Sequence, residues 1–230
     1  MAKIVDSKGR SDAKSGYSRL FGNQQLGQLI SRVQAAVIRT GNELERIIEN
    51  ETPVNQKTSL DAILSYYGDI FPSDVQVVFQ PRMPRELGKP GITVDIAVFD
   101  HSKRQVSIIE LKDGDTFDTK KASGELESMS NFAGWISRKI GYDASFFFCS
   151  FNQDDKEAIV RGAKGRFGIE RAMTGRELCD ILTIDYDVLR ERRQSEQSEN
   201  LRFFVEELLK ISEIRQMIVA LLRGEKTAGD

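Results

Sequence analysis

Two carboxylates and one ammonium group are spaced so that they can act together on a phosphodiester. Asp95 lies in one apolar, strand-like run, and Glu110 and Lys112 lie in the next. Because side chains alternate across a strand, Glu110 and Lys112 point to one face and Leu111 to the other. If residues 102–103 form the tip of a hairpin, Asp95 lies opposite Glu110, with the two Cβ atoms about 5 Å apart. Both carboxylates can then bind one divalent cation beside Lys112.

This combination supplies what phosphodiester hydrolysis requires. A divalent cation lowers the pKa of an attacking water and stabilises the charge that develops on the phosphate, and an ammonium group helps to orient the water. The two acids lie in runs too apolar for a half-exposed sheet, where an unpaired charge is costly, so a bound cation is favoured. Glu-x-Lys at a strand end also occurs on solvated strands without any catalytic role, so only the surrounding elements can distinguish a catalytic motif from an exposed strand face.

The elements that must position these residues follow one another in a regular order. Residues 24–50 carry apolar side chains with a helical period, which predicts one long helix or two joined near Gly41. A helix over 119–140 lies between two strands, which predicts a right-handed crossover to a parallel neighbour. Strands are expected at residues 75–80, 92–99, 105–112 and 144–151, and a short helix at 59–67 after Ser59. The pattern predicts an α/β fold with a central mixed sheet of at least four strands, flanked by helices.

The two ends of the chain differ from this central part. Residues 1–22 are polar and rich in glycine and serine, which indicates a mobile arm or an edge segment. The sequence after residue 151 is mainly helical. Its helices are expected at 153–163, at 174–182 with Thr174 as N-cap, at 186–193 and at 201–222.

Composition excludes several classes of protein. The 230 residues carry a formal net charge of −2, which excludes a uniformly basic DNA-coating protein. Cys149 and Cys179 are isolated, which indicates a reducing cytoplasm and neither a disulfide framework nor a zinc site. No apolar stretch is long enough to cross a membrane, and no nucleotide-binding motif is present. His101 is the single histidine, which excludes nucleases that use a histidine base.

The three charged residues and the order of elements resemble the PD-(D/E)XK nuclease superfamily, and within it the type II restriction endonucleases. Residues 24–151 are similar to the family core of helix, three-stranded antiparallel meander, helix and parallel strand. The resemblance implies a restriction-endonuclease-like core in which Asp95, Glu110 and the carbonyl of Leu111 hold Mg²⁺ and Lys112 positions the attacking water. The "PD" pair is imperfect, because Val94 precedes Asp95.

A third acid joins this site in some members of the family. Glu45 is similar to the helix glutamate that those members add to the metal site. It borders the apolar stripe of the predicted 24–50 helix, and Glu43 borders the other side. Either residue is also compatible with a solvated helix flank.

Basic residues near glycine indicate where DNA could bind. The segment 161–171 interleaves small residues with basic side chains; glycine permits close approach to a sugar-phosphate strand, and arginine can bind a guanine edge. Lys120 or Lys121, after the catalytic strand, is expected to contact a backbone phosphate. Exposed loops with no binding role remain the alternative for both segments. The basic residues of the first segment are Arg161, Lys164, Arg166 and Arg171.

The resemblance implies a Mg²⁺-dependent, sequence-specific double-stranded DNA endonuclease that acts as a homodimer and leaves 5′-phosphates. We expect a single nuclease domain over residues 1–230, with 24–151 as the catalytic core and 152–230 contributing to DNA recognition or dimerisation. One alternative is a structure-selective repair, junction or transposition nuclease of the same superfamily. Another is a non-catalytic DNA-binding module that retains the fold.

Overall fold

The computed structural model describes residues 1–9, 16–65, 73–85, 91–114 and 119–224, without the side chains of residues 119–122. It divides into two compact units. A sheet unit comprises Glu45–Tyr186, and a helical unit comprises Met1–Leu44 together with Asp187–Asp230. Within the described ranges no helix is long and apolar enough to cross a membrane.

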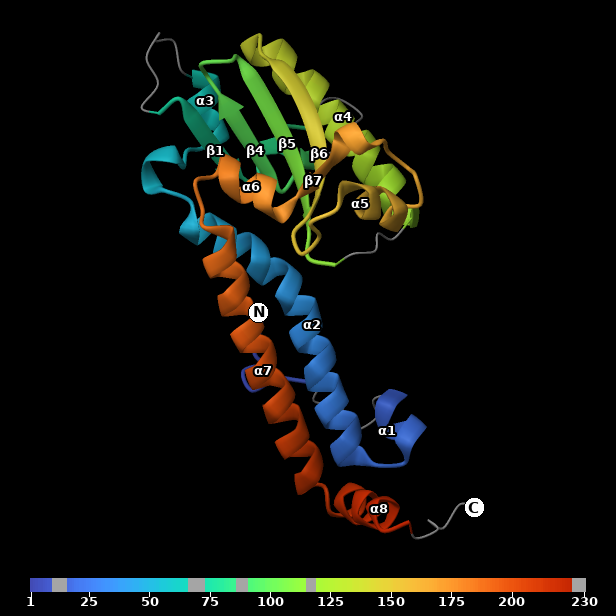
Figure 1. The fold of residues 1–230 in the computed structure, drawn as a ribbon. Helices are drawn as coiled ribbons and strands as arrows, with labels where there is room; N and C mark the ends of the chain where they lie inside the picture. The colour runs from blue at the N-terminus through green and yellow to red at the C-terminus, as the bar shows by residue number, and fades with distance from the viewer. Residues whose placement is uncertain (10–15, 66–72, 86–90, 115–118, 225–230) are drawn as a thin grey trace. The chain divides into compact units, whose positions relative to one another are not determined.

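The sheet unit is built on five strands in the order β1-β4-β5-β6-β7 (Figure 1). The first three strands in this order form an antiparallel meander, and β6 and β7 continue the sheet in parallel. The strands are β1 (Val75–Phe79), β4 (Ile96–Asp100), β5 (Gln105–Lys112), β6 (Asp143–Ser150) and β7 (Ala172–Thr174). A second small sheet pairs β2 (Arg82–Met83) with β3 (Ile92–Thr93). The predicted α/β fold with a mixed, meander-plus-parallel sheet is therefore confirmed.

The predicted helices are largely present, and some match to the residue. The crossover helix spans 119–140 as expected, and Thr174 caps its helix with a reciprocal hydrogen-bonded box to Glu177. The long helix continues through Gly41 without a break. The helices are α1 (Gly16–Phe21), α2 (Gln24–Glu51), α3 (Leu60–Ser65), α4 (Thr119–Ile140), α5 (Lys156–Gly162), α6 (Gly175–Ile181), α7 (Tyr186–Lys210) and α8 (Ser212–Leu222), with 3₁₀ turns at Val54–Gln56 and Ile169–Arg171.

Two expectations about secondary structure were wrong, and one strand was missed. The strand predicted over 92–99 is interrupted at residues 94–95, where the chain leaves β3 and bends into β4. The helices predicted at 186–193 and 201–222 are divided differently: α7 runs without a break from Tyr186 to Lys210, and α8 begins at Ser212 after Ile211. The polar residues between them favour helix even though they carry no apolar period. Strand β7 was missed because three buried residues are too few to show alternation.

Different helices cover the two faces of the sheet (Figure 1). Helix α4 packs on the face that carries Ile108 and Phe148, both fully buried. Helix α6 lies on the opposite face, where its Leu178 is fully buried. Since alternate residues of a strand share a face, Glu110 and Lys112 lie on the same side of β5 as Ile108. The charged end of β5 therefore faces the helix that follows it in the chain.

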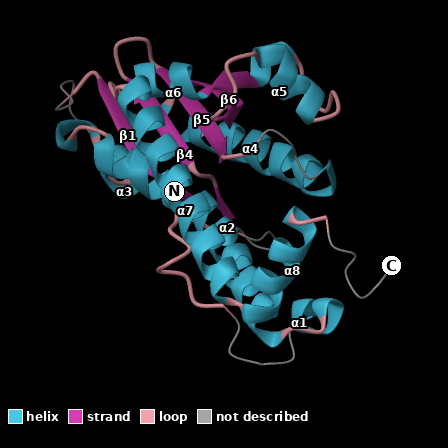
Figure 2. Cartoon of the chain, turned by 60° about the horizontal axis from the view of Figure 1, so that its bottom comes forward, coloured by secondary structure: helices cyan, strands magenta, loops and turns pink. Residues whose placement is uncertain are grey.

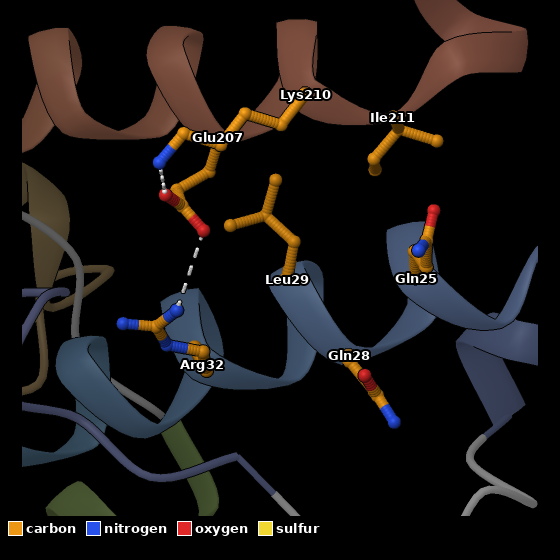
Figure 3. A pocket seen from close by; sticks show the side chains of 7 residues that line it. All are labelled: Gln25, Gln28, Leu29, Arg32, Glu207, Lys210 and Ile211. Atoms are coloured by element: carbon orange, nitrogen blue, oxygen red, sulfur yellow. Dashed lines mark hydrogen bonds and ion pairs between the residues drawn. The ribbon is translucent and has the colours of Figure 1, made fainter.

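The helical unit pairs α2 with α7, which lie side by side in both views (Figures 1 and 2). The guanidinium of Arg32 on α2 lies 5.0 Å from the ring centre of Phe203 and 3.7 Å from the Glu207 carboxylate, both on α7. Figure 3 shows this ion pair beside a hollow of about 230 Å³. These contacts join the two long helices. The hollow is lined by Gln25, Gln28, Leu29, Arg32, Glu207, Lys210 and Ile211.

The first nine residues differ from the mobile arm expected from their composition. Ala2 and Ile4 are buried, and Asn200 on α7 binds the backbone of both: it accepts from the Ile4 N–H at 2.8 Å and donates to the Ala2 carbonyl at 2.9 Å. Arg32 donates to the carbonyl of Ser7 at 3.2 Å. Composition did not show this, because side chains distant in sequence satisfy the backbone of the segment. Residues 10–15 lie outside the described part of the chain.

One close contact in the sheet unit predicts a large loss of stability. A Cβ added to Gly175 would lie 2.0 Å from the carbonyl oxygen of Phe151, which is backbone. We expect Gly175→Ala to lower the free energy of unfolding by about 2 kcal/mol or more, because the chain after β6 must move away. Gly124→Ala is the control: a Cβ there meets nothing within 4 Å on helix α4, so stability should rise slightly. Urea unfolding of both variants measures the difference; equal midpoints would contradict the expectation.

Candidate active site

The predicted register of the hairpin is confirmed. Strands β4 and β5 pair from Asp100 opposite Gln105 to Ile96 opposite Ile109. One step further in the same register, Asp95 at the bend before β4 comes opposite Glu110, and the two carboxylates interact electrostatically. The backbone N–H of Leu111 donates to Oδ2 of Asp95 at 2.7 Å, which ties the Asp95 side chain to β5. The polar turn that sets this register occupies residues 101–104. The two carboxylates therefore lie on one face at the end of the hairpin.

Lys112 is held between two acids. Its Nζ lies 2.6 Å from Oε1 of Glu110 and 2.9 Å from Oε1 of Glu125, a residue of α4. The three side chains are mostly covered, with exposed fractions of 30% for Lys112, 14% for Glu110 and 25% for Glu125. The backbone of Lys112 is fixed as well, because its carbonyl accepts from the Phe151 N–H at 2.9 Å. The ammonium group thus has a defined position at the end of β5.

Gln80 connects Glu45 to this group of residues. Its side-chain amide donates to Oε2 of Glu45 at 3.0 Å, and its backbone N–H donates to the carbonyl of Asp95 at 2.7 Å. Gln80 has a φ of +47°, a left-handed conformation that places both donors at this point. Glu45 is close enough to act electrostatically on Asp95 and on Glu110. Glu43, in the helical unit, lies 3.7 Å from the N-terminal amine.

The electrostatics of the site favour a cation. Burial, together with the carboxylates of Glu110 and Glu45, raises the pKa of Asp95 to about 7 against the opposing hydrogen bond from Leu111. Burial also raises the pKa of Glu110, although Lys112 opposes it. Raised pKa values mean that the negative charge on these two acids is poorly compensated.

The pKa of Lys112 moves in the direction that keeps it charged. Burial alone would lower this pKa, but the carboxylates of Glu110 and Glu125 outweigh burial and raise it to about 12. The side chain is therefore an ammonium group throughout the neutral range. It can donate hydrogen bonds and stabilise negative charge, but it cannot serve as a base.

The donor set suits a hard divalent ion. In an extended strand the N–H and C=O of one residue point the same way, so the carbonyl of Leu111 faces the side on which its N–H meets Asp95. Two carboxylates and one carbonyl are oxygen ligands of the kind that Mg²⁺ prefers, with water completing the shell. Among the described residues, no three His, Cys, Asp or Glu side chains form a metal cluster by themselves. The fit therefore rests on Asp95, Glu110 and the backbone.

The basic residues predicted to contact DNA differ in their exposure and in the contacts that they make. Lys164 and Arg166 are exposed on the turn after α5. Arg161 is exposed but pairs with Asp155 at 3.2 Å, and the guanidinium of Arg171 lies 4.0 Å over the ring of Phe146. The side chains of Lys120 and Lys121 lie outside the described residues. Phe167 stacks on Phe148 with ring centres 4.4 Å apart, which anchors the turn to the sheet.

Comparison with known proteins identifies the family. No protein-family model matches the chain. The chain is 39% identical over 223 residues to the type II restriction enzyme HhaII of Haemophilus parahaemolyticus, and the match covers 95% of this chain and 98% of that enzyme. The chain belongs to the type II restriction enzymes. Membership makes it a site-specific deoxyribonuclease, and it favours the restriction function over both alternatives raised from the sequence.

Two residues that contact the candidate site of this restriction enzyme were not predicted from the sequence: Glu125 and Gln80. Glu125 comes four residues before the buried Met129, so it continues the sheet-facing stripe of α4 toward β5. An acid on an otherwise apolar stripe was the signal that could have identified it. Gln80 gave no comparable signal, because its role depends on a left-handed backbone conformation after β1.

Proposed function

We propose that this restriction enzyme is a Mg²⁺-dependent double-stranded DNA endonuclease of the PD-(D/E)XK type, with its site at Asp95, Glu110 and Lys112. The observation that carries the proposal is the opposed pair of carboxylates on one face of the hairpin, with an ammonium group on the same face. The hydrogen bond from Leu111 to Asp95 supports a shared site for the two strands.

Asp95, Glu110 and the carbonyl of Leu111 would hold the ion, with Glu45 assisting. When bound, Mg²⁺ supplies a Lewis acid that lowers the pKa of water and offsets charge on the phosphate. Lys112 donates a hydrogen bond that orients the attacking water in line with the scissile bond. The water oxygen bonds to phosphorus as the bond from phosphorus to the 3′ oxygen breaks, and that oxygen leaves with a proton. The products are a 5′-phosphate and a 3′-hydroxyl.

Double-stranded DNA is the proposed partner, and a homodimer the proposed assembly. Cutting both strands of a palindrome needs two sites related by a twofold axis. Lys164 and Arg166 are exposed on a turn anchored to the sheet, which supports a contact with DNA. Lys120 and Lys121 are proposed to contact backbone phosphates. Arg161 and Arg171 are also proposed to contact DNA, although each already has a partner within the protein. We retain the single nuclease domain over 1–230 as part of the proposal.

The cytoplasm is the proposed compartment. Both cysteines, Cys149 and Cys179, are buried thiols and not a disulfide. Thiols in this state are typical of proteins that work under reducing conditions.

A digest of DNA of known sequence tests the proposal. The purified protein is incubated with linear and supercoiled DNA, with Mg²⁺ or with a chelator, and the ends of the products are sequenced. We expect discrete fragments in Mg²⁺ only, with one repeated sequence at every cut and 5′-phosphates that a ligase can join. A smear of random fragments, or equal cutting in the chelator, would contradict it.

The raised pKa of Asp95 predicts how the affinity for Mg²⁺ depends on pH. The ion must displace the proton that Asp95 binds below its pKa of about 7. We therefore expect the dissociation constant to be nearly constant above pH 8 and to increase by up to about tenfold per pH unit below pH 7. Titration calorimetry with MgCl₂ in buffers from pH 5.5 to 8.5 measures it. An affinity that does not change across this range would show that Asp95 does not bind the ion.

A further inference from the structure

We propose that Glu125 is a positioning residue for Lys112: it fixes the direction of the ammonium group from helix α4. The inference rests on the proposed function, because it concerns how the lysine of that site is held. Lys112 is the last residue of β5, and Glu110 on the same strand supplies one acceptor for its ammonium group. A lysine side chain has four flexible bonds and needs an acceptor beyond its own strand to be fixed.

The contacts of Lys112 come from two different elements. Glu110 is two residues away on the same strand and accepts at 2.6 Å, whereas Glu125 lies on the second turn of α4 and accepts at 2.9 Å. Two acceptors on different elements define a direction, which one acceptor does not. Glu125 is itself held in place, because α4 is locked on the sheet by the buried Met129 and Phe132.

The two acids have separable tasks. Glu110 belongs to the pair of carboxylates opposed across the hairpin, so in the proposed site its oxygens would be shared between the ion and Lys112. Glu125 contacts Lys112 from α4 and is not part of the hairpin. Its ion pair with the ammonium group is separate from that of Glu110. The geometry thus separates the residue that helps to hold the ion from the one that aims the lysine.

Steady-state and single-turnover cleavage of Glu125→Ala is the first test. We expect kcat to fall about 10- to 100-fold, since a shift of about 1 Å in a reacting group costs up to 10²-fold. KM for DNA, DNA affinity without metal, and the calorimetric affinity for Mg²⁺ should stay within about threefold of wild type. Glu125→Gln, which keeps an oxygen acceptor at the same reach, should restore most of kcat. Glu127→Ala, an exposed acid two residues along α4, is the matched control and should behave as wild type.

A double-mutant cycle separates positioning from other effects. If Glu125 acts through Lys112, the double variant Lys112→Ala with Glu125→Ala should cut no more slowly than Lys112→Ala alone. NMR of the lysine ammonium groups in the metal-free protein gives a reading that does not depend on activity. Exchange of the Lys112 ammonium protons with water should speed up severalfold in Glu125→Ala and not in Glu127→Ala.

Several results would overturn the proposal. They are a wild-type kcat in Glu125→Ala, a Glu125→Gln enzyme as slow as the alanine variant, additive losses in the cycle, or a loss confined to KM. Failure of the proposed function looks different, because Lys112→Ala would then cut as fast as wild type, or wild type would cut no DNA. The Lys112→Ala and wild-type arms therefore report on the function, and the Glu125 arms report on positioning.

Discussion

Replacement of Lys112 by alanine is expected to lower the rate of DNA cleavage by about 10²- to 10³-fold, while DNA binding stays within about threefold of wild type. The ammonium group of Lys112 lies beside the paired carboxylates at the end of β5, with its Nζ 2.6 Å from Oε1 of Glu110. In the proposed mechanism, removing it takes away a hydrogen-bond donor to the attacking water and to the negative charge that develops on the phosphate. Single-turnover cleavage of a short duplex in Mg²⁺, with binding measured in its absence, gives both quantities.

The control for Lys112 must change charge by the same amount elsewhere. Lys139 is exposed near the end of α4, so Lys139→Ala should cut at the wild-type rate. Lys112→Arg should recover little activity, because a planar guanidinium does not replace a compact ammonium between two acids. If Lys112→Ala cut DNA at the wild-type rate, the lysine would have no part in the chemistry and the proposed site would be wrong.

Replacement of Asp95 by asparagine is expected to abolish cleavage and yet to stabilise the metal-free protein at pH 8. Asparagine keeps an oxygen that can accept from the Leu111 N–H, but it loses the charge needed to bind a divalent ion. Cleavage should fall by about 10³-fold or more. The stability gain follows from burial and neighbouring acids, which raise the pKa of Asp95 to about 7. A site that is costly to fold and necessary for function is a common trade-off in enzymes.

The sign of the pH dependence can be worked out from Asp95. Its carboxyl has a reference pKa of 3.8 and a folded pKa of about 7, so the folded protein binds more protons than the unfolded chain between these values. Wild-type stability therefore falls as pH rises from about 4 to 7. The advantage of Asp95→Asn should be largest above pH 7 and should shrink toward pH 5. Thermal unfolding in a chelator at pH 5 and pH 8 measures it.

Asp100 provides a control of opposite sign on the same hairpin. Burial opposes ionisation of Asp100, but hydrogen bonds from Lys103 and Ser102 outweigh it and lower the pKa to about 2. Its carboxylate therefore stabilises the fold above about pH 4, and Asp100→Asn should lower stability at pH 8. Cleavage by Asp100→Asn should match wild type, since Asp100 lies at the other end of β4. Parallel changes in the two variants would show that local charge does not explain the shifts.

Local features of the sequence predicted the register of the hairpin that carries the candidate site, but they did not predict contacts between residues far apart in the chain. A short polar turn and the two-residue repeat of a strand fix the register, so the opposition of Asp95 and Glu110 followed from neighbouring residues alone. The crossover helix was predicted for the same reason, because its apolar period is long and regular. Elements that depend on tertiary partners were missed or misplaced. The short β7 is defined by its pairing with β6, and residues 1–9 are held by Asn200 and Arg32.

The dependence on tertiary contacts also explains which residues of the candidate site could be predicted from the sequence and which could not. The hairpin supplies three of its charged residues, and resemblance to a family suggested Glu45 on the preceding helix. The contact between Glu125 and Lys112 depends on how α4 returns along the sheet, which no local pattern specifies. Gln80 depends on a left-handed backbone at the end of β1, a conformation that its residue type does not predict.

In the proposed site, the acids around Lys112 would also make the approach of DNA depend on a bound cation. Above pH 7, where Asp95 is ionised, a phosphate that approached without a cation would meet Glu45, Asp95, Glu110 and Glu125 and would be repelled, since their combined charge exceeds that of the ammonium group. A bound divalent ion would offset most of this charge, and by reciprocity a bound phosphate would increase the affinity for the ion. The proposed site would therefore repel the DNA backbone until a divalent ion binds.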